Sequence, residues 1–237
     1  MGQKVNPIAY RTGIMLGWKS RWYASKQQFA ELLLEDQKIR KFIKHNPKNN
    51  YKNAGIDRIE IERTRDEVKI ILRVARPGVI IGRKGEEVER LQADLQNLIV
   101  RRVNLKIEEV SRPERRAQLV AEEIAEQLVK RSSFRRTMKR AMEATMEAGA
   151  KGIKIQLSGR LGGAEMSRCE KQISGSIPLS TLRADIDYGF TEARTAQGQV
   201  GVQVWIHNGM FSTTGETDGA DAEEGKAPKG PKKTYKR

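Results

Sequence analysis

Residues 79–88 read VIIGRKGEEV and place two glycines, Gly82 and Gly85, on either side of the basic pair Arg83 and Lys84. Apolar residues alternate before this run and recur at helical spacing after it, so the run is predicted to join a strand to a helix. Glycine has no Cβ, so such a loop lets a sugar or phosphate approach the backbone while the middle residues add positive charge. The sequence contains neither the Gly-x-Gly-x-x-Gly fingerprint of dinucleotide-binding folds nor a nucleotide phosphate loop. The alternative interpretation is a tight turn at a helix start with two solvated basic residues.

In these surroundings the run resembles the signature of the KH domain, in which a Gly-x-x-Gly loop joins two short helices. The flanking apolar residues predict a helix from Ser25 to Asn46-Pro47, strands at 59–61 and 68–74, a helical segment at 88–98 and a strand at 103–107. This order corresponds to the bacterial, second type of KH topology. We therefore predict a type II KH domain of the α+β class over residues 17–111.

A second α+β domain is predicted over residues 112–211. Its expected elements are two helices, at 119–128 and 134–142, and four strands, at 153–157, 166–173, 182–188 and 200–206. Gly149 is expected to end the second helix. Helices followed by strands in this way are typical of the α+β class.

Two terminal segments are expected to lie outside these domains. Residues 1–16 carry Gly2, Pro7 and Gly13, with Lys4 and Arg11 among small residues, which predicts an irregular basic N-terminal arm. Residues 212–237 contain almost no bulky apolar side chains, and their acids from Glu216 to Glu224 are followed by lysines, which predicts a disordered tail.

The charge balance indicates a partner that is a polyanion. The chain has 45 Lys and Arg against 30 Asp and Glu, a net charge of +15. Nucleic acid is the leading candidate, because cations that bind phosphates along a strand release its counterions, and this release favours binding. A membrane is the alternative, but no apolar run approaches the roughly 18 residues that a membrane span needs. The single cysteine, Cys169, excludes an intramolecular disulfide.

A dense basic cluster lies at the start of the second domain. Six cations and no acid occur within eleven residues, namely Lys130, Arg131, Arg135, Arg136, Lys139 and Arg140. On a helix, Arg131, Arg135 and Lys139 would form one row at four-residue steps. Phe134, Met138 and Met142 would lie on the opposite side and anchor the helix. An ordinary solvated helix face is the alternative, but such faces intersperse Glu with Lys, so we expect phosphate binding here.

Several longer motifs are similar to one family. They are GQKVNP (2–7), ARPGVIIG (75–82), FRR (134–136), SGRLGGAE (158–165) and LRADIDY (182–188). Together they resemble small-subunit ribosomal protein three in its bacterial or organellar form, over residues 1–211. That resemblance implies a structural constituent of a cytoplasmic ribosome, or of an organellar one, with no enzymatic activity, cofactor or metal.

The resemblance also implies partners and RNA-binding residues. The expected partners are small-subunit ribosomal RNA, messenger RNA, ribosomal proteins ten and fourteen in the head of the subunit, and ribosomal proteins four and five at the messenger entrance. The residues expected at that entrance are Arg131, Arg135, Arg136, Lys139 and Arg140, and the KH loop contributes Gly82, Arg83, Lys84 and Gly85. The residues expected to bind ribosomal RNA are Gly2, Gln3, Lys4, Asn6, Pro7, Arg11, Arg160 and Arg183. In the family, the residues corresponding to Arg135, Arg136 and Lys139 are associated with helping to unwind structured messenger.

Two other classes of function fit the sequence less well. A free KH regulator that binds messenger away from ribosomes would carry a similar loop and basic helix, but the second domain and the arm argue against it. An enzyme acting on nucleic acid would have only two histidines and one cysteine for a metal site or a nucleophilic pair. We expect His45 at a helix end and His207 on the surface of a turn. Acidic pairs such as Asp185 and Asp187 lie among basic residues, so charge balance explains them.

Overall fold

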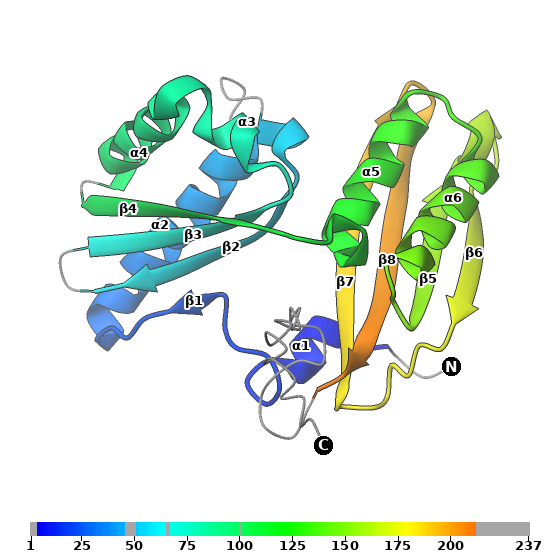
Figure 1. Cartoon of the computed structure of the whole chain (residues 1–237), viewed down its shortest axis with the longest axis horizontal. Coiled ribbons are helices and arrows are strands. Elements are labelled where there is room, and N and C mark those ends of the chain that lie inside the picture. The colour runs from blue at the N-terminus through cyan, green and yellow to red at the C-terminus, as the bar shows by residue number, and fades with distance from the viewer. Residues whose placement is uncertain (1–3, 46–50, 65–66, 100, 212–237) are drawn as a thin grey trace, which may run out of the picture.

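The computed structural model describes residues 4–45, 51–64, 67–99 and 101–211. These residues form two α+β units that lie side by side, each built on a four-stranded sheet (Figure 1). The fold class predicted from the sequence is therefore confirmed. The predicted helix end at Asn46-Pro47 and the predicted tail lie outside the described residues.

The first unit has the element order expected of the second KH type. Its sheet runs β1-β2-β3-β4, with β2 and β3 antiparallel and β3 and β4 parallel. The strands are β1 (Ser20–Arg21), β2 (Ile56–Arg63), β3 (Glu67–Val74) and β4 (Arg102–Glu109). The helices are α2 (Lys26–His45), α3 (Pro77–Ile81) and α4 (Glu86–Ile99), with 3-10 segments η1 (Tyr51–Ala54) and η2 (Arg83–Gly85). No pattern in the sequence indicates β1, because two residues are too few to show alternation.

The core of the first unit lies between its helices and one face of the sheet. Alternate residues of β2 and β3 point toward the helices, and Ile61 is paired with Ile70 across the two strands. The core is completed by Ile39 and Ile43 of α2 and by Leu91 and Leu95 of α4.

The predicted apolar stripe of α2 is only partly correct. Its second half is buried as expected, but Phe29 and Leu33 are about half exposed. Every residue from Lys26 to Glu31 is exposed, although the Phe29 ring lies 5.3 Å from the Trp22 ring. The first turns of α2 therefore lie outside the core of the first unit. Helical spacing alone does not indicate where a helix extends beyond the edge of the sheet that it covers.

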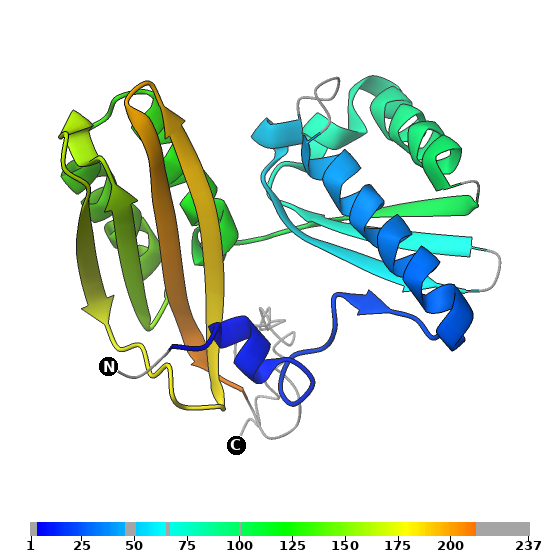
Figure 2. The ribbon, with the colours of Figure 1, turned by 180° about the vertical axis from the view of Figure 1, so that it is seen from behind.

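The second unit is an antiparallel sheet with two helices on one face, as Figures 1 and 2 show from opposite sides. The order of strands is β6-β5-β8-β7. The elements are η3 (Pro113–Arg115), α5 (Ala117–Val129), α6 (Phe134–Glu147), β5 (Gly152–Gly159), η4 (Leu161–Gly163), β6 (Arg168–Gly175), β7 (Ala184–Thr195) and β8 (Gly198–Met210). The core joins Ile124 and Met138 of the helices to alternate residues of β5 and β8, including Ile155 and Val204. The two helices and four strands predicted here are all present.

The prediction of an irregular N-terminal arm is wrong. The arm contains the short helix α1 (Pro7–Arg11). The Asn6 side chain accepts hydrogen bonds from the first free amides of α1, which caps the helix. Arg11 is fully buried, and its guanidinium donates to the backbone carbonyls of Pro7, Leu179, Thr181 and Ala184 at 2.6–3.2 Å. The start of the chain is therefore fixed to the second unit, before the chain enters the first one.

An ion pair connects the two units. The carboxylate of Asp187 on β7 accepts a hydrogen bond from Arg58 of β2 at 3.1 Å and another from the Ala117 amide, at the start of α5, at 2.9 Å. A side chain at Gly189 would collide with the Ala117 carbonyl, so glycine allows α5 to begin directly against β7. One buried carboxylate thus fixes both the first turn of α5 and a strand of the KH unit.

Two further aspartates surround this pair. Asp57 Oδ2 lies 3.6 Å from Arg58 Nε and 3.7 Å from Arg116 Nε. Burial raises the pKa of Asp57, and the nearby charge of Asp187 raises it further. The pKa of Asp185 is raised by the same two causes. The contact between the units therefore contains carboxylates whose ionisation is disfavoured.

We expect Asp187→Ala to lower the free energy of unfolding by about 3 kcal/mol, because it removes the hydrogen-bond acceptor of the partly buried Arg58 and of the buried Ala117 amide. Asp187→Asn keeps an oxygen for the amide and should cost roughly half as much. Urea unfolding followed by tryptophan fluorescence measures both. The exposed Glu192 of the same strand is the control, since Glu192→Gln should change stability by less than about 0.5 kcal/mol. Equal losses for Asp187→Ala and Glu192→Gln would contradict this role.

The raised pKa of Asp57 predicts a pH dependence with a definite sign. Between the pKa of the unfolded state and the higher pKa of the folded state, Asp57 is protonated in the folded state and ionised in the unfolded state. The contribution of Asp57 to stability is therefore lost as pH rises through the folded pKa. We expect wild type and Asp57→Asn to have similar stability below pH about 3.9, the ordinary aspartate value. The variant should become relatively more stable as pH rises above it, in urea unfolding at a series of pH values. A relative loss for the variant over that range would mean that the pKa of Asp57 is lowered.

Candidate nucleic-acid interface

The glycine loop joins two helices as the sequence predicts. Gly82 follows α3 with φ +69° and ψ −169°, η2 continues to Gly85 at φ +86°, and α4 begins at the next residue. A Cβ at Gly82 would lie 2.6 Å from Glu87 Cγ, whereas one at Gly85 would meet open space. Ile80 is fully buried beside the loop, and the Arg83 side chain is exposed. The loop therefore presents backbone and one described cation to the solvent from a fixed base.

Acidic residues lie immediately after this loop. Glu86, Glu87 and Glu89 occupy the first turn of α4, where they complement the helix dipole. Glu87 also pairs with Arg90 at 3.4 Å. The charges of these acids offset those of the basic residues near the loop, so an approaching ligand would meet mainly exposed backbone.

The second candidate surface is the outer face of α6. Arg135, Arg136, Lys139 and Arg140 are exposed there, with side-chain exposures of 71% for Arg135 and 73% for Lys139. Met138 is buried, and Phe134 and Met142 pack against the same core. The predicted division of this helix into a basic face and an anchoring face is therefore correct.

Arg131 does not belong to that row. It lies in the turn between α5 and α6 with φ +60°, a left-handed conformation unusual for a residue other than glycine. Lys130 caps the end of α5 and Ser133 is the N-cap of α6. The prediction of one continuous helical row from Arg131 to Lys139 is therefore wrong, although Arg131 is exposed beside the row.

The basic face of α6 has two acidic neighbours, one on the same helix and one on β6. Arg135 lies 3.9 Å from Glu170 of β6, and Lys139 lies 3.8 Å from Glu143. Such exposed pairs are weak and screened by salt, so phosphates can replace them. The guanidinium groups of Arg135 and Arg168 lie 5.6 and 5.5 Å from the centroid of the Phe134 ring. This ring holds two cations close to the surface without neutralising them.

The residues predicted to bind ribosomal RNA are spread over separate places. Lys4, Arg160 and Arg183 are exposed, although Arg160 already donates to the carbonyls of Ala164 and Gln197. Asn6 caps α1, whereas Pro7 and Arg11 are buried. Gly2 and Gln3 lie outside the described residues. The position of Arg11 contradicts its predicted RNA contact, because backbone carbonyls of the protein surround its guanidinium.

Comparisons with known proteins agree with this division into two units. The family model described as "KH domain" matches residues 38–115, and the one described as "Ribosomal protein S3, C-terminal domain" matches residues 124–206. The chain is 70% identical over 238 residues to "Small ribosomal subunit protein uS3" of Rhodopirellula baltica, and the match covers the whole of both chains. The chain belongs to the uS3 family. Relatives with the same name in Treponema denticola and Pelotomaculum thermopropionicum are each 50% identical, with 89% and 95% of this chain and 87% and 96% of those chains covered.

Membership of the uS3 family confirms the resemblance drawn from the sequence motifs. The chain is a protein of the small ribosomal subunit with a KH domain, and its relatives are named as ribosomal proteins and not as enzymes. Within the described ranges, no helix is long and apolar enough to cross a membrane. The same ranges contain no group of three or more His, Cys, Asp or Glu side chains that could hold a metal ion.

One histidine of this uS3 chain lies where the sequence did not predict it. His207 is not on a turn surface but is buried in β8, with Nδ1 2.9 Å from the Ser176 carbonyl oxygen. Long β8 continues three residues past it, so the following Asn208-Gly209 pair is part of the strand and not a turn. His45 is the last residue of α2, as expected.

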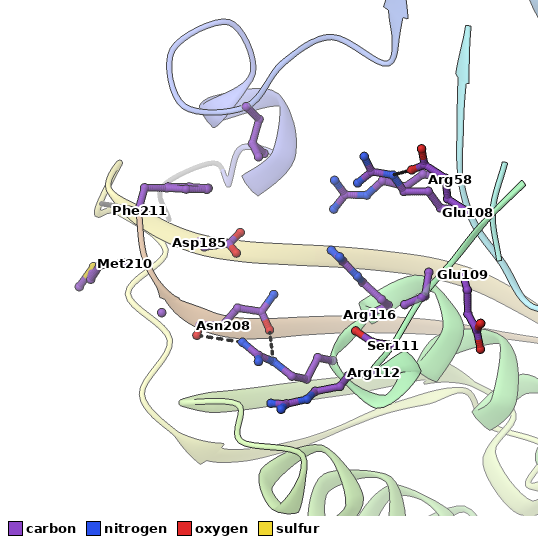
Figure 3. Close-up of a pocket in the computed structure, with 15 residues that line it drawn as sticks. Arg58, Glu108, Glu109, Ser111, Arg112, Arg116, Asp185, Asn208, Met210 and Phe211 are labelled. Atoms are coloured by element: carbon purple, nitrogen blue, oxygen red, sulfur yellow. Dashed lines mark hydrogen bonds and ion pairs between the residues drawn. The ribbon is translucent and has the colours of Figure 1, made fainter. Parts of the chain in front are cut away.

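A pocket between the two units was not foreseen from the sequence. It has a volume of about 320 Å³, and Figure 3 shows side chains of both units converging on it. Its charged lining consists of Arg58, Arg73, Arg112, Arg115, Arg116, Glu108, Glu109 and Asp185. These residues come from distant parts of the chain, so no local motif could indicate them.

The two loop glycines should differ in their tolerance of a side chain. Gly85→Ala places a Cβ at positive φ in open space and should cost about 1 kcal/mol of folding free energy. Gly82→Ala adds a collision with Glu87 in a backbone region that only glycine readily occupies, and should cost about 2–3 kcal/mol. Urea unfolding of the two variants checks the order. An equal or larger loss for Gly85→Ala would contradict the loop geometry.

Proposed function

We propose that this chain binds ribosomal RNA in the head of the small subunit and lines the entrance through which messenger RNA reaches the decoding centre. The observation that carries the proposal is the exposed cationic face of α6. Four cations stand on one rigid helix whose other side is buried in the core of the second unit. A helix held in this way keeps its cations at fixed spacing, which suits a polyanion that moves past them.

At this entrance the protein would act on messenger without chemistry of its own. Arg135, Arg136 and Lys139 would contact phosphates of single-stranded messenger and release counterions. Movement of messenger by the ribosome would supply the work, and the cations would favour the open form of a fluctuating duplex. The absence of a nucleotide phosphate loop in the sequence supports this passive role.

The KH loop would form a second RNA contact. Gly85 leaves open space for a sugar or phosphate against the backbone, and Arg83 adds an exposed cation. The exposed Lys4, Arg160 and Arg183 would add contacts to ribosomal RNA. Arg11 is left out of this set because it is buried.

Protein neighbours are also proposed. Family resemblance suggests ribosomal proteins ten and fourteen in the head and four and five at the messenger entrance, in a cytoplasmic ribosome. The structure supports a protein-covered surface near the start of the chain. Large apolar side chains are exposed there at Val5, Tyr10, Ile14, Trp18, Tyr23, Phe29, Leu33 and Leu34. Concentrated exposure of this kind is typical of surfaces that a partner covers.

Replacing Arg135, Arg136 and Lys139 with Ala should weaken binding to unstructured RNA and reduce the slope of log affinity against log salt by about 2. In ribosomes carrying the variant, translation through a stable hairpin should slow more than translation of unstructured messenger. Filter binding over a salt series and translation rates on matched messengers measure the two effects.

The matched control replaces Lys26, Lys38 and Lys41, three exposed cations of α2, with Ala. It removes the same charge from another helix and should leave the difference between hairpin and unstructured messenger as in wild type. Equal slowing on both messengers by the α6 variant would argue against a role in unwinding.

A further inference from the structure

The sheet of the second unit has one face that the helices do not cover. Helices α5 and α6 pack on the other face, whereas in Figure 2 the uncovered face is turned toward the viewer, with α1 against the lower end of β7. Burial alternates along β5: Ile153, Ile155 and Leu157 are fully buried, but Lys154 and Gln156 between them are not. The side chains that point away from α5 and α6 therefore stand on an open sheet face.

Two rows of side chains cross this open sheet face from β6 to β7. The strand register places Ile173, Lys154, Trp205 and Tyr188 in the first row, and Lys171, Gln156, Gln203 and Phe190 in the second. Aromatic rings thus gather on β7 and β8, with one lysine in each row and an acid in neither. Such a combination of rings, amides and cations is typical of surfaces that bind single-stranded nucleic acid.

The rings are held in place and remain accessible to solvent. The centroids of the Tyr188 and Trp205 rings lie 5.3 Å apart, and a side-chain hydrogen bond joins Tyr188 to Gln203. Phe190 is 46% exposed. A Cβ at Gly201 would lie 3.9 Å from the Phe190 ring, so the glycine leaves that side of the ring without a covering side chain. Rings fixed in this way can stack on a base with little further loss of conformational freedom.

The lysines beside these rings favour an anionic partner. Lys154 Nζ lies 4.8 Å from the centroid of the Trp205 ring. Partial burial lowers the pKa of Lys154, and the positive charges of Lys4 and Lys171 lower it further. A phosphate among these three cations would offset their mutual repulsion. A second copy of the chain would instead bring the same cations against one another, so nucleic acid fits this face better than another copy does.

We propose that the open sheet face binds unpaired bases of RNA, which stack on the rings of Phe190, Tyr188 and Trp205. Lys154 and Lys171 contact the phosphates between these bases. The inference rests on the proposed binding of ribosomal RNA and gives that RNA a surface of its own. Because α6 lies on the opposite face of the same sheet, the two surfaces hold different segments of RNA. Stacking releases no counterions, so this contact suits an RNA that stays bound while messenger moves past α6.

Two labelled oligomers of about ten units distinguish stacking from charge: oligouridylate, and a ribose-phosphate chain of the same length without bases. Their affinities are measured by fluorescence anisotropy in the full chain carrying R135A, R136A and K139A, so that α6 does not mask the sheet face. Phe190→Ala should weaken binding of oligouridylate about fivefold or more and that of the base-free oligomer less than about twofold. Lys154→Gln should weaken both alike. Failure of the parent chain to bind oligouridylate at low salt, or equal effects of Phe190→Ala on the two oligomers, would overturn the proposal.

Substitutions at the same position provide the matched controls. Phe190→Tyr keeps the ring and should bind oligouridylate within about twofold of the parent chain. Phe190→Leu removes the ring but keeps an apolar side chain, and it replaces Phe190→Ala if circular dichroism shows that the alanine variant does not fold. If small subunits assembled with Phe190→Leu lose a neighbouring protein while affinity for oligouridylate is unchanged, the face binds protein and the proposal is wrong. The messenger-entrance proposal is tested by comparing the α6 variant with wild type, so the two can fail separately.

Discussion

The arrangement of the two units depends on one buried carboxylate. Asp187 receives a hydrogen bond from the KH unit, through Arg58, and another from the first amide of α5, which starts the second unit. Removing a charge from water is costly, and the cost is offset only where the partners are held in place. Here Asp187 lies on β7 and its partners lie on β2 and α5, so the same contact sets the start of α5 and the position of β2. The RNA surfaces proposed for α6 and for the KH loop are attached to these elements.

Much of the fold could be predicted because its signals are local. Alternation over Val68 to Val74 and helical spacing on α6 report which side of each element is buried. The glycine loop could also be predicted from local sequence, because glycine readily adopts positive φ and both Gly82 and Gly85 have positive φ. The cations of α6 were found for the same reason, because Met138 and its neighbours mark the opposite side.

The remainder depends on contacts between distant residues, which no local pattern contains. Arg11 was expected to bind RNA, yet three of its four carbonyl partners lie more than 160 positions away. Asp187 was attributed to charge balance, whereas it connects the units. His207 was placed on a turn because Asn-Gly follows it, but pairing with β7 extends β8 through these residues. Arg131 was placed on a helix because of its four-residue spacing from Arg135, which does not indicate the turn between α5 and α6.

The burial of Arg11 has a consequence for synthesis on the ribosome. The arginine is made early, but Ala184, which accepts its hydrogen bond, follows 173 positions later. At about 5–20 residues per second, the nascent chain waits roughly 10–30 s before that acceptor exists. Throughout this interval the KH unit can fold, while the N-terminal arm has not yet docked on the second unit. Docking of the N-terminal arm is thus one of the last steps in folding of this chain. It can occur only after the segment around Ala184 has been made.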